Sequence, residues 1–266
     1  MTRHESEDVE ERSSPRAPVI YEVVRRHGEE EMVRPAVSLW WSGFAAGLSI
    51  SFSLLAQALL TEHVPDAPWR PLVTSFGYSV GFLMVVLARQ QLFTENTITI
   101  VLPLMARFGW RTVGRLVRVW GIVLAANLVG TLFAATFCTV TPVIDQDLRD
   151  AMLEISRHMM ENDWPQMFFK GIASGFLIAT MVWLIPSSGG SQFLVITLMT
   201  WLIALGEFTH IVAGSAEAFL LMLHGELEVW RMLTGFMLPV LLGNVVGGTV
   251  LFALIAYAQV MKELDY

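Results

Sequence analysis

Long stretches without a charged side chain are the feature that most constrains what this chain can fold into. A helix needs about 20 apolar residues to cross the roughly 30 Å hydrocarbon core of a bilayer. Uncharged runs of about this length or longer occur at residues 36–61, 71–88, 119–144, 171–206 and 232–261. Only 15% of all residues are charged, whereas about a quarter are charged in soluble domains. The sequence therefore predicts an all-α integral membrane protein.

The fourth uncharged run is long enough for nearly two membrane crossings. It contains Pro186-Ser-Ser-Gly-Gly190, a cluster of turn-forming residues that predicts a hairpin. Counted with this hairpin, the chain has six membrane spans within residues 36–261. The charged segment before them, residues 1–35, and the tail after them, residues 262–266, are expected to lie in the cytoplasm. Because the first segment has no apolar core, it is not a secretory signal, and the first span is expected to direct the chain to the membrane.

The distribution of charge predicts the orientation of the chain in the membrane. Lys and Arg are enriched in the cytoplasmic loops of membrane proteins. The basic segment contains Arg107, Arg111, Arg115 and Arg118, whereas residues 145–163 carry six acidic side chains and two arginines. We therefore expect the acidic loop on the outer side and both termini in the cytoplasm, in an inner membrane of bacterial type. Apolar residues at helical spacing predict an outer amphipathic helix over about residues 146–163; they are Leu148, Met152, Ile155 and Met159.

The two halves of the chain share three sequence matches in the same order. They are Gly43 and Gly47 with Gly171 and Gly175, Leu92-Phe-Thr94 with Glu207-Phe-Thr209, and Asn127-Leu-Val-Gly130 with Asn244-Val-Val-Gly247. Each half contains three spans, and since this number is odd, the second half enters the membrane from the opposite side. The pattern predicts two inverted three-helix repeats, about residues 36–144 and 165–261. The glycine pairs place small residues on one helix face, and we expect them to serve tight helix packing.

Polar residues gather once in each half, within sequence that is otherwise apolar. These segments are residues 89–96 and residues 207–210. A charge at membrane depth costs at least ~2.5 kcal/mol on insertion scales, so such residues normally face a partner or a watery cavity. Unwound backbone at that depth is tolerated only where it is buried in protein or lines a cavity. We therefore expect the two segments to interrupt spans two and five and to line a pore.

The ends of the interrupted helices suggest what such a pore favours. Thr94 and Thr209 are expected to N-cap the half-helices that follow them. In an inverted repeat these half-helices approach the midplane from opposite faces, and their N-terminal ends present partial positive charge to a shared centre that suits a small anion. His210 is placed at this centre, and two interpretations stay open for it. It is either a titratable group that donates to an anion or a buried neutral imidazole that bonds a loop carbonyl.

Several motifs together resemble the formate/nitrite transporter family. They are Leu92-Phe-Thr94, Phe208-Thr209-His210 followed by Ala213, Leu242-Gly-Asn-Val-Val-Gly-Gly248, and the glycine-rich first span at residues 42–50. The resemblance runs from about residue 36 to 260. It implies an aquaporin-like fold and a homopentamer in which each protomer has its own pore. It also implies transport of small weak-acid monoanions such as formate, nitrite or hydrosulfide.

The resemblance also assigns roles to single residues. It places Leu92, Phe93 and Thr94 on the loop that interrupts span two, His210 on the loop of span five, and Asn244 in span six. The implied mechanism puts His210 between two apolar constrictions, where it attracts the anion and can supply a proton. The physical motive is that a neutral acid crosses an apolar constriction far more cheaply than an ion. Leu92 and Phe93 are the candidate constriction residues, with Ile203 as a further candidate.

The chain departs from the family pattern near the expected pore. Gly175 and Gly214 stand where the family has asparagine, so the centre is expected to be wider or differently selective. Arg89 stands where the family has glycine. It is either an anion-attracting site or one partner of a structural ion pair, and the candidate partners are Glu95, Glu207 and Glu217. We favour the ion pair, because an unpaired guanidinium at membrane depth is costly.

Three classes of function were weighed on these observations. The leading hypothesis is a channel or transporter for a small monovalent anion, moved as such or together with a proton. The alternative keeps the fold but carries a neutral solute such as water or glycerol, given the glycines that replace asparagine. A membrane-embedded enzyme is disfavoured because the sequence has neither an HExxH nor a GxxxxGK[ST] motif. We accordingly expect no catalytic residues, metal site or cofactor, and no nucleic-acid partner.

The segment at residues 21–33 is charged and compatible with a helix. In the resembling family the N-terminal segment can sit under the pore and gate it. For this chain we favour a solvated tail helix.

Overall fold

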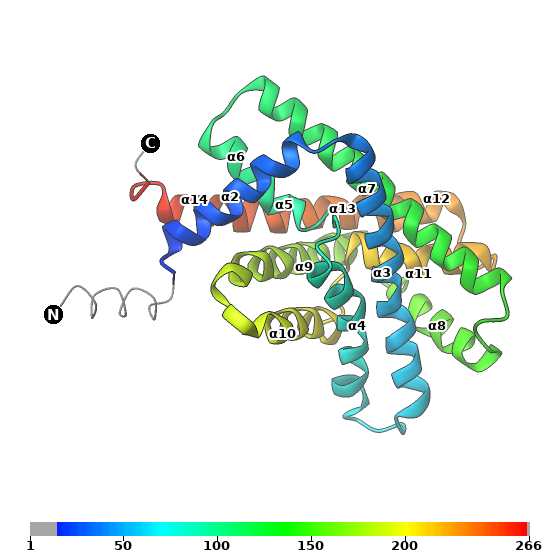
Figure 1. The fold of residues 1–266 in the computed structure, drawn as a ribbon. Helices are drawn as coiled ribbons and strands as arrows, with labels where there is room; N and C mark the ends of the chain where they lie inside the picture. The colour runs from blue at the N-terminus through cyan, green and yellow to red at the C-terminus, as the bar shows by residue number, and fades with distance from the viewer. Residues whose placement is uncertain (1–14, 265–266) are drawn as a thin grey trace.

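The fold of residues 15–264, which the computed structural model describes, is built from helices alone (Figure 1). Residues 1–14 and 265–266, which belong to the predicted cytoplasmic segments, lie outside this range. The long helices are α3 (Ala36–His63), α4 (Arg70–Leu87), α7 (Trp110–Val140) and α9 (Trp164–Leu184). The last long helical segment is continuous from Val229 to Val260, and it comprises α12 (Val229–Arg231), η3 (Met232–Met237), α13 (Leu238–Val245), η4 (Val246–Ala253) and α14 (Leu254–Val260). The predicted all-α membrane fold is confirmed, because these five segments are long and apolar enough to cross a bilayer.

Two further apolar stretches are broken rather than continuous. After α4, residues 88–95 are not helical, and the short helices α5 (Asn96–Thr99) and α6 (Val101–Ala106) follow. In the second half, α10 (Gln192–Leu205) and α11 (Ile211–Leu223) are separated by residues 206–210. The turn predicted between spans four and five is formed by the 3₁₀ segments η1 (Ile185–Ser187) and η2 (Gly189–Ser191). Both breaks fall where the sequence predicted an interruption.

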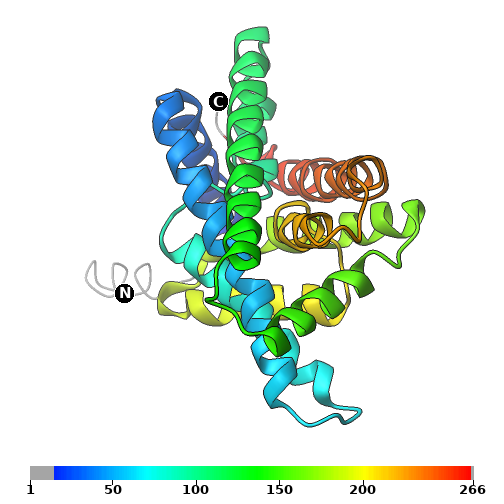
Figure 2. The ribbon, with the colours of Figure 1, turned by 90° about the vertical axis from the view of Figure 1, so that its right-hand side faces the viewer.

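The glycine pairs pack helices closely, as predicted. Figure 2 shows α7 running beside α3, and at their contact a Cβ on Gly47 would overlap the carbonyl oxygen of Asn127. In the second half, α9 meets α13 in the same way, since a Cβ on Gly175 would overlap the carbonyl oxygen of Asn244. Close backbone approach of this kind is the usual way for helices to associate in lipid.

The predicted amphipathic helix is α8 (Gln146–Met159), which ends a few residues earlier than expected. Asp145 caps it by accepting a hydrogen bond from the Leu148 amide at 2.9 Å. Its apolar face is buried against α3 and α11, while Arg157 on the other face pairs with Glu226 at 2.5 Å. The helix stops because Asp163 starts α9 with a capping box to Gln166.

The expectation of a solvated tail helix for residues 21–33 was wrong. Helix α2 (Ala17–Val33) packs against α5 and α6, and it buries Tyr21, Val24 and Met32. A Cβ on Gly28 would overlap the Thr99 carbonyl, so the backbones of α2 and α5 are in direct contact. Because this helix carries many charges, its composition did not indicate that one of its faces is apolar.

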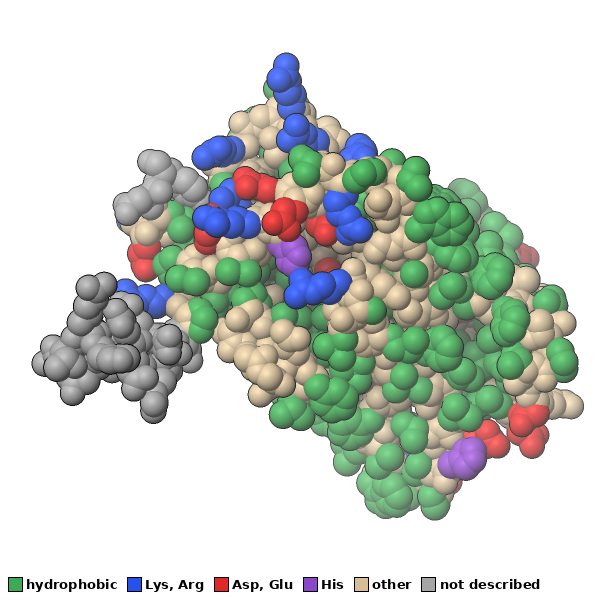
Figure 3. Space-filling model, in the orientation of Figure 1, with side chains coloured by type: hydrophobic (Ala, Val, Ile, Leu, Met, Phe, Trp, Pro, Cys, Tyr) green, Lys and Arg blue, Asp and Glu red, His purple; other side chains and the backbone are tan. Residues whose placement is uncertain are grey.

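The outer surface of the molecule divides by side-chain type. Hydrophobic side chains cover most of the face in Figure 3, whereas Lys and Arg gather at its upper end, over α2 and the beginning of α7. An apolar surface of this extent is expected of a protein surrounded by lipid or by further subunits.

Candidate functional site

Each broken helix stops at a residue with left-handed backbone. Glu207 has φ +52°, and the turn is closed by the Glu207 amide bonded to Ala204 at 3.0 Å and the Phe208 amide bonded to Ile203 at 2.9 Å. Arg89 has the same φ of +52° and forms the corresponding turn at the end of α4. This is the ordinary helix ending in which glycine is preferred. A non-glycine residue there carries backbone strain of roughly 1–2 kcal/mol, so the surrounding structure must hold both breaks in place.

Asn127 on α7 supports the first break. It is fully buried, and its Oδ1 accepts a hydrogen bond from the Phe93 amide at 2.9 Å. Its Nδ2 donates to the carbonyl oxygens of Gly43 and Gln91, both at 2.8 Å. The side chain thus replaces hydrogen bonds that the backbone lost when the helix was interrupted.

Asn244 on α13 supports the second break in the same manner. Its Oδ1 accepts from the Ile211 amide at 2.9 Å. Its Nδ2 donates to the carbonyl oxygens of Gly171 at 2.9 Å and Thr209 at 3.1 Å. Asn244, predicted to belong to the pore, is therefore a fully buried support of the loop that holds His210.

These contacts correct the predicted register between the halves. Because Asn127 bonds the Phe93 amide where Asn244 bonds the Ile211 amide, Leu92 corresponds to His210. The sequence match had paired Leu92 with Glu207. The Phe-Thr pairs in the two loops are a coincidence, since the equivalence depends on backbone amides and carbonyls rather than on side chains.

His210 and Thr94 join the two breaks directly. The Nε2 atom of His210 lies 2.7 Å from Oγ1 of Thr94, and its Nδ1 accepts a hydrogen bond from the Ala213 amide at 3.1 Å. Since Nδ1 accepts, a neutral ring carries its proton on Nε2 and donates it to Thr94. Both side chains are almost completely buried.

The predicted capping roles of the two threonines were wrong. Helix α11 is capped by His210 itself, while the Thr209 hydroxyl donates to the Met167 carbonyl at 2.8 Å. Helix α5 has Glu95 at its N-cap position, without a side-chain cap. The Thr94 hydroxyl caps no helix in the described structure, because it is hydrogen-bonded to His210.

Two pockets approach this centre, one beside the middle of α4 and the other at its C-terminal end. The first, here called the α8 pocket, has a volume of about 90 Å³ and contains His210, Glu207, Glu217 and Tyr78 together with residues of α8. The second, the α2 pocket, has about 160 Å³, and its charged or titratable lining residues are His27, Glu31, Arg89 and Glu95. The α8 pocket touches α4 at Tyr78 and the α2 pocket at Val86, which are about 12 Å apart along the helix.

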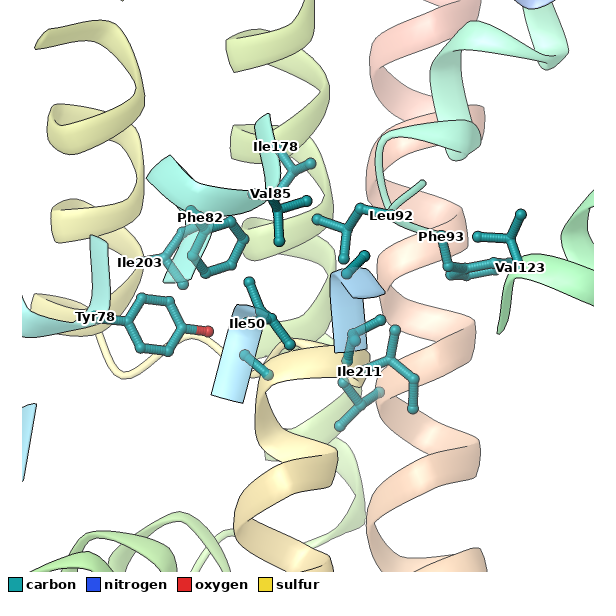
Figure 4. Packing of buried hydrophobic residues seen from close by; sticks show 14 of the residues in the cluster. Ile50, Tyr78, Phe82, Val85, Leu92, Phe93, Val123, Ile178, Ile203 and Ile211 are labelled. Carbon is teal, nitrogen blue, oxygen red and sulfur yellow. The ribbon is translucent and has the colours of Figure 1, made fainter. Parts of the chain in front are cut away.

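An apolar cluster separates the two pockets. Phe82, Val85, Leu92 and Ile178 are fully buried and gather at one place, with Ile203 at its edge (Figure 4). The Phe82 ring also contacts His210 edge to face, with 5.2 Å between ring centroids. A polar centre is thereby placed against an apolar barrier.

The three predicted constriction residues do not all lie at one constriction. Leu92 belongs to the apolar cluster, and Ile203 is buried at the wall of the α8 pocket. Phe93 points away from the cluster toward Val123 on α7, and its ring packs on Trp120 with 5.6 Å between centroids (Figure 4). Phe93 therefore packs the core beside the first break.

The predicted widening at the two glycines is not found. Gly175 lies at the contact of α9 with α13, where the Asn244 backbone occupies the space for a side chain. Gly214 borders the α8 pocket, but a Cβ there would lie 2.7 Å from the Phe236 ring and 3.0 Å from the sulfur of Met159. Larger neighbours fill the volume that asparagine would take.

The predicted ion pair of Arg89 was also wrong. Glu207 binds Lys170 at 3.2 Å and His158 at 3.1 Å, whereas Arg89 has no carboxylate within 4.0 Å among residues 15–264. Arg89 and Glu207 occupy opposite pockets, which the sequence distance alone does not reveal. The hydrogen bond that His158 donates to Glu207 raises the pKa of His158, which lies on α8 outside the spans.

Three side chains near His210 were missed or misread in the sequence: Phe82 contacts its ring, and Tyr78 and Glu217 line the α8 pocket. Phe82 and Tyr78 lie in an apolar run where nothing marked them, and Glu217 was considered only as a partner for Arg89. A lone acid in the middle of the apolar helix α11 was the available signal.

Comparison with known proteins agrees with this architecture. The family model described as "Formate/nitrite transporter" matches residues 18–258. The chain is 45% identical over 256 residues to the inner membrane protein YfdC of Escherichia coli, covering 96% of this chain and 83% of that protein. It is 28% identical to the formate channel FocA of Haemophilus influenzae, covering 82% and 84% of the two chains. These relatives are named as membrane proteins and channels, not as enzymes.

Solved structures show the same fold at lower sequence identity. A pentameric formate channel with formate bound superposes with a TM-score of 0.74 at 21% identity, covering 85% of this chain and 98% of that one. An ion channel of the same family gives a TM-score of 0.79 at 19% identity, with 90% and 98% covered. Together with the family match over nearly the whole chain, this establishes a multi-pass membrane protein that belongs to the formate/nitrite transporter family.

Proposed function

We propose that this chain is a channel or transporter for small monovalent weak-acid anions of the formate, nitrite or hydrosulfide class. The observation that carries the proposal is the hydrogen bond between His210 and Thr94, which sits where two broken helices meet and faces an apolar barrier. A buried N–H donor next to a polar pocket suits an anion, and the barrier favours its neutral acid. The formate channel of Haemophilus influenzae supports the choice of solute.

The proposed channel domain, residues 36–261, has six spans in two inverted repeats. The spans are α3, α4 with α5 and α6, α7, α9, α10 with α11, and the helix from α12 to α14. The equivalent hydrogen bonds of Asn127 and Asn244 support the repeat, because each reaches from the third span of its half to the break in the second. The outer helix α8 joins the halves, and the flanking segments 1–35 and 262–266 face the cytoplasm.

The charge distribution supports the proposed orientation. Arg118 on α7 donates to the Arg34 carbonyl at 2.9 Å, so the basic segment and α2 are on the same side. Lys and Arg favour the cytoplasmic side, which makes the α2 pocket the inner one and the α8 pocket the outer one. Arg89, which forms no ion pair among residues 15–264, lines the inner pocket and then attracts anions there.

In the proposed mechanism the anion reaches the outer pocket past Lys170 and His158. His210 then exchanges its bond to Thr94 for a bond to the anion. The species that crosses Phe82, Val85 and Leu92 is the neutral acid, because a bare ion in apolar surroundings costs far more. Proton and anion therefore move together.

We further propose that the chain forms a homopentamer with a pore in each protomer. A pentameric relative of the same fold supports this assembly. The broad apolar surface in Figure 3 supplies area for contacts between subunits as well as for lipid. Helix α2, packed under the inner pocket, is in position to gate each pore.

Flux into proteoliposomes tests the proposal. Formate, nitrite and hydrosulfide are offered at several pH values, and the protein-dependent flux is compared with that of His210→Asn. Flux of at least one solute with an altered pH profile in the variant is expected. If none of the three solutes is transported, the proposed substrate class is wrong. Rapid osmotic swelling in water or glycerol would favour the neutral-solute alternative.

A further inference from the structure

The outer pocket contains three polar side chains whose functional groups have no protein partner. Among residues 15–264, no hydrogen bond or ion pair involves the Gln57 amide, the Tyr78 hydroxyl or the Glu217 carboxyl, although all three line the pocket with His210. Tyr78 and Glu217 are only 7% and 8% exposed. Buried polar groups are nearly always bonded, so the unbonded side chains of Tyr78 on α4 and Glu217 on α11, with the partly exposed Gln57 of α3 beside them, indicate a site for a ligand.

Glu217 lines the same pocket as His210, two turns further along α11. It comes seven residues after His210, which places the two on the same face of α11 about 10 Å apart along its axis. Gly214 lies between them on that face and adds no side chain. An anion in this pocket therefore lies among Glu217, Tyr78 and the histidine.

His210 is poorly placed to give its proton to that anion. Its Nδ1 already accepts from the Ala213 amide, and its Nε2 proton is held by Thr94 at 2.7 Å. Donation of this proton would leave a buried imidazole with two acceptor nitrogens and an anionic charge, which the apolar wall formed by Phe82 disfavours. The histidine can orient an anion, but a different group must protonate it.

We propose that Glu217 is the proton donor of the outer pocket, with Tyr78 and Gln57 holding the anion beside it. This inference rests on the proposed function and deepens it. The Glu217 O–H bond breaks and leaves its electron pair on the carboxylate oxygen, while the anion supplies the pair for its new O–H or S–H bond. Hydronium from the outer water then restores the acid. Each cycle moves one proton with one anion.

Glu217 is better suited to donate the proton than the other titratable groups around it. On the elements that line the pocket they are Tyr78 of α4, His158 of α8, and Glu207 and His210 at the break before α11. Glu207 is held by Lys170 and His158, both at the pocket opening. Tyr78 is a hydrogen-bond donor whose ordinary titration lies near pH 10. Glu217 is the remaining carboxyl of the pocket.

The test compares wild type with Glu217→Gln in proteoliposomes, with formate as the probe. Wild-type uptake is expected to rise as the outer pH falls, and the variant is expected to lose this dependence and about 100-fold of the acid-side rate, as for removal of a positioned acid. Glu228→Gln, an exposed glutamate with no ion pair in the described structure, is the matched control and keeps the wild-type profile. Tyr78→Phe should raise the formate concentration for half-maximal uptake while leaving the pH profile unchanged.

Infrared difference spectroscopy separates this inference from the proposed function. A pH change should produce a carboxylic-acid carbonyl band that shifts when formate is added and is missing in Glu217→Gln. If uptake occurs but the variant keeps the wild-type pH profile, or if the band is absent, Glu217 is not the donor and the anion channel stands. If wild type transports none of the anions, the proposed transport function is wrong. In that case a formate-sensitive Glu217 band would still support the acid site, and absence of the band would overturn it.

Discussion

The Nε2 atom of His210 lies 2.7 Å from the Thr94 hydroxyl, although 116 residues separate them in the chain. This one contact connects the loop after α4 with the loop before α11. It is the only side-chain hydrogen bond of the His210 ring in the described structure, since Nδ1 binds a backbone amide. Both halves of the chain therefore contribute to the hydrogen bonds that hold the His210 ring.

Replacing Thr94 by valine should disturb the centre without changing its volume. The Nε2–H group of His210 would lose its buried acceptor, and an unsatisfied buried donor costs about 1–3 kcal/mol. We expect a lower thermal unfolding midpoint in detergent and an altered pH dependence of anion flux. Thr94→Ser is the matched control, because it keeps the hydroxyl. Equal behaviour of the valine and serine variants would show that the bond is unimportant.

Asn127 and Asn244 should be equally intolerant of alanine. Each holds a broken helix by accepting one amide proton and donating to backbone carbonyls. Removal leaves several buried backbone groups unpaired, at about 1–3 kcal/mol for each. We expect both variants to unfold at clearly lower temperature and to lose flux. Asn162→Ala, which removes a single bond to the Met159 carbonyl, serves as the control and should lower the midpoint far less.

The sequence predicted the fold better than it predicted the site, and the reason lies in what each depends on. Uncharged runs and glycine spacing report burial in lipid and helix contact, so the breaks after α4 and α10 were predicted correctly. The partner of a single side chain depends on which pocket it faces. Arg89 and Glu207 looked like an ion pair, yet they line two different pockets. The stripe of α2 and the direction of Phe93 likewise emerge only from three-dimensional packing.

Arg89 offers a test of the strain at the first break. Its φ of +52° suits glycine, and its guanidinium forms no ion pair in the described structure. Arg89→Gly should therefore raise stability by about 1 kcal/mol, the lower end of the cost of left-handed backbone. In Glu207→Gly the same relief is offset by loss of the contacts to Lys170 and His158. A lower unfolding midpoint for Arg89→Gly would mean that the guanidinium stabilises the fold in another way.

The cluster at the α8 pocket should give a small dependence of stability on pH. Hydrogen bonds to Glu207 and Glu161 raise the pKa of His158 above its ordinary value. Since the folded pKa exceeds the unfolded one, the stabilisation is fully present below the unfolded pKa of about 6.5. It is lost as the pH rises through the folded pKa. The side chain is 60% exposed, so the effect should stay below about 1 kcal/mol.

The matched variant for this pH effect is His158→Gln, which keeps a hydrogen-bond donor but cannot titrate. Unfolding midpoints measured between about pH 5 and pH 8 should fall with rising pH in wild type and lose that component in the variant. Lys170 continues to bind Glu207 in this variant, so the fold at the break after α10 is retained. An unchanged slope in His158→Gln would assign the pH dependence to another group, with Glu217 in the same pocket as the next candidate.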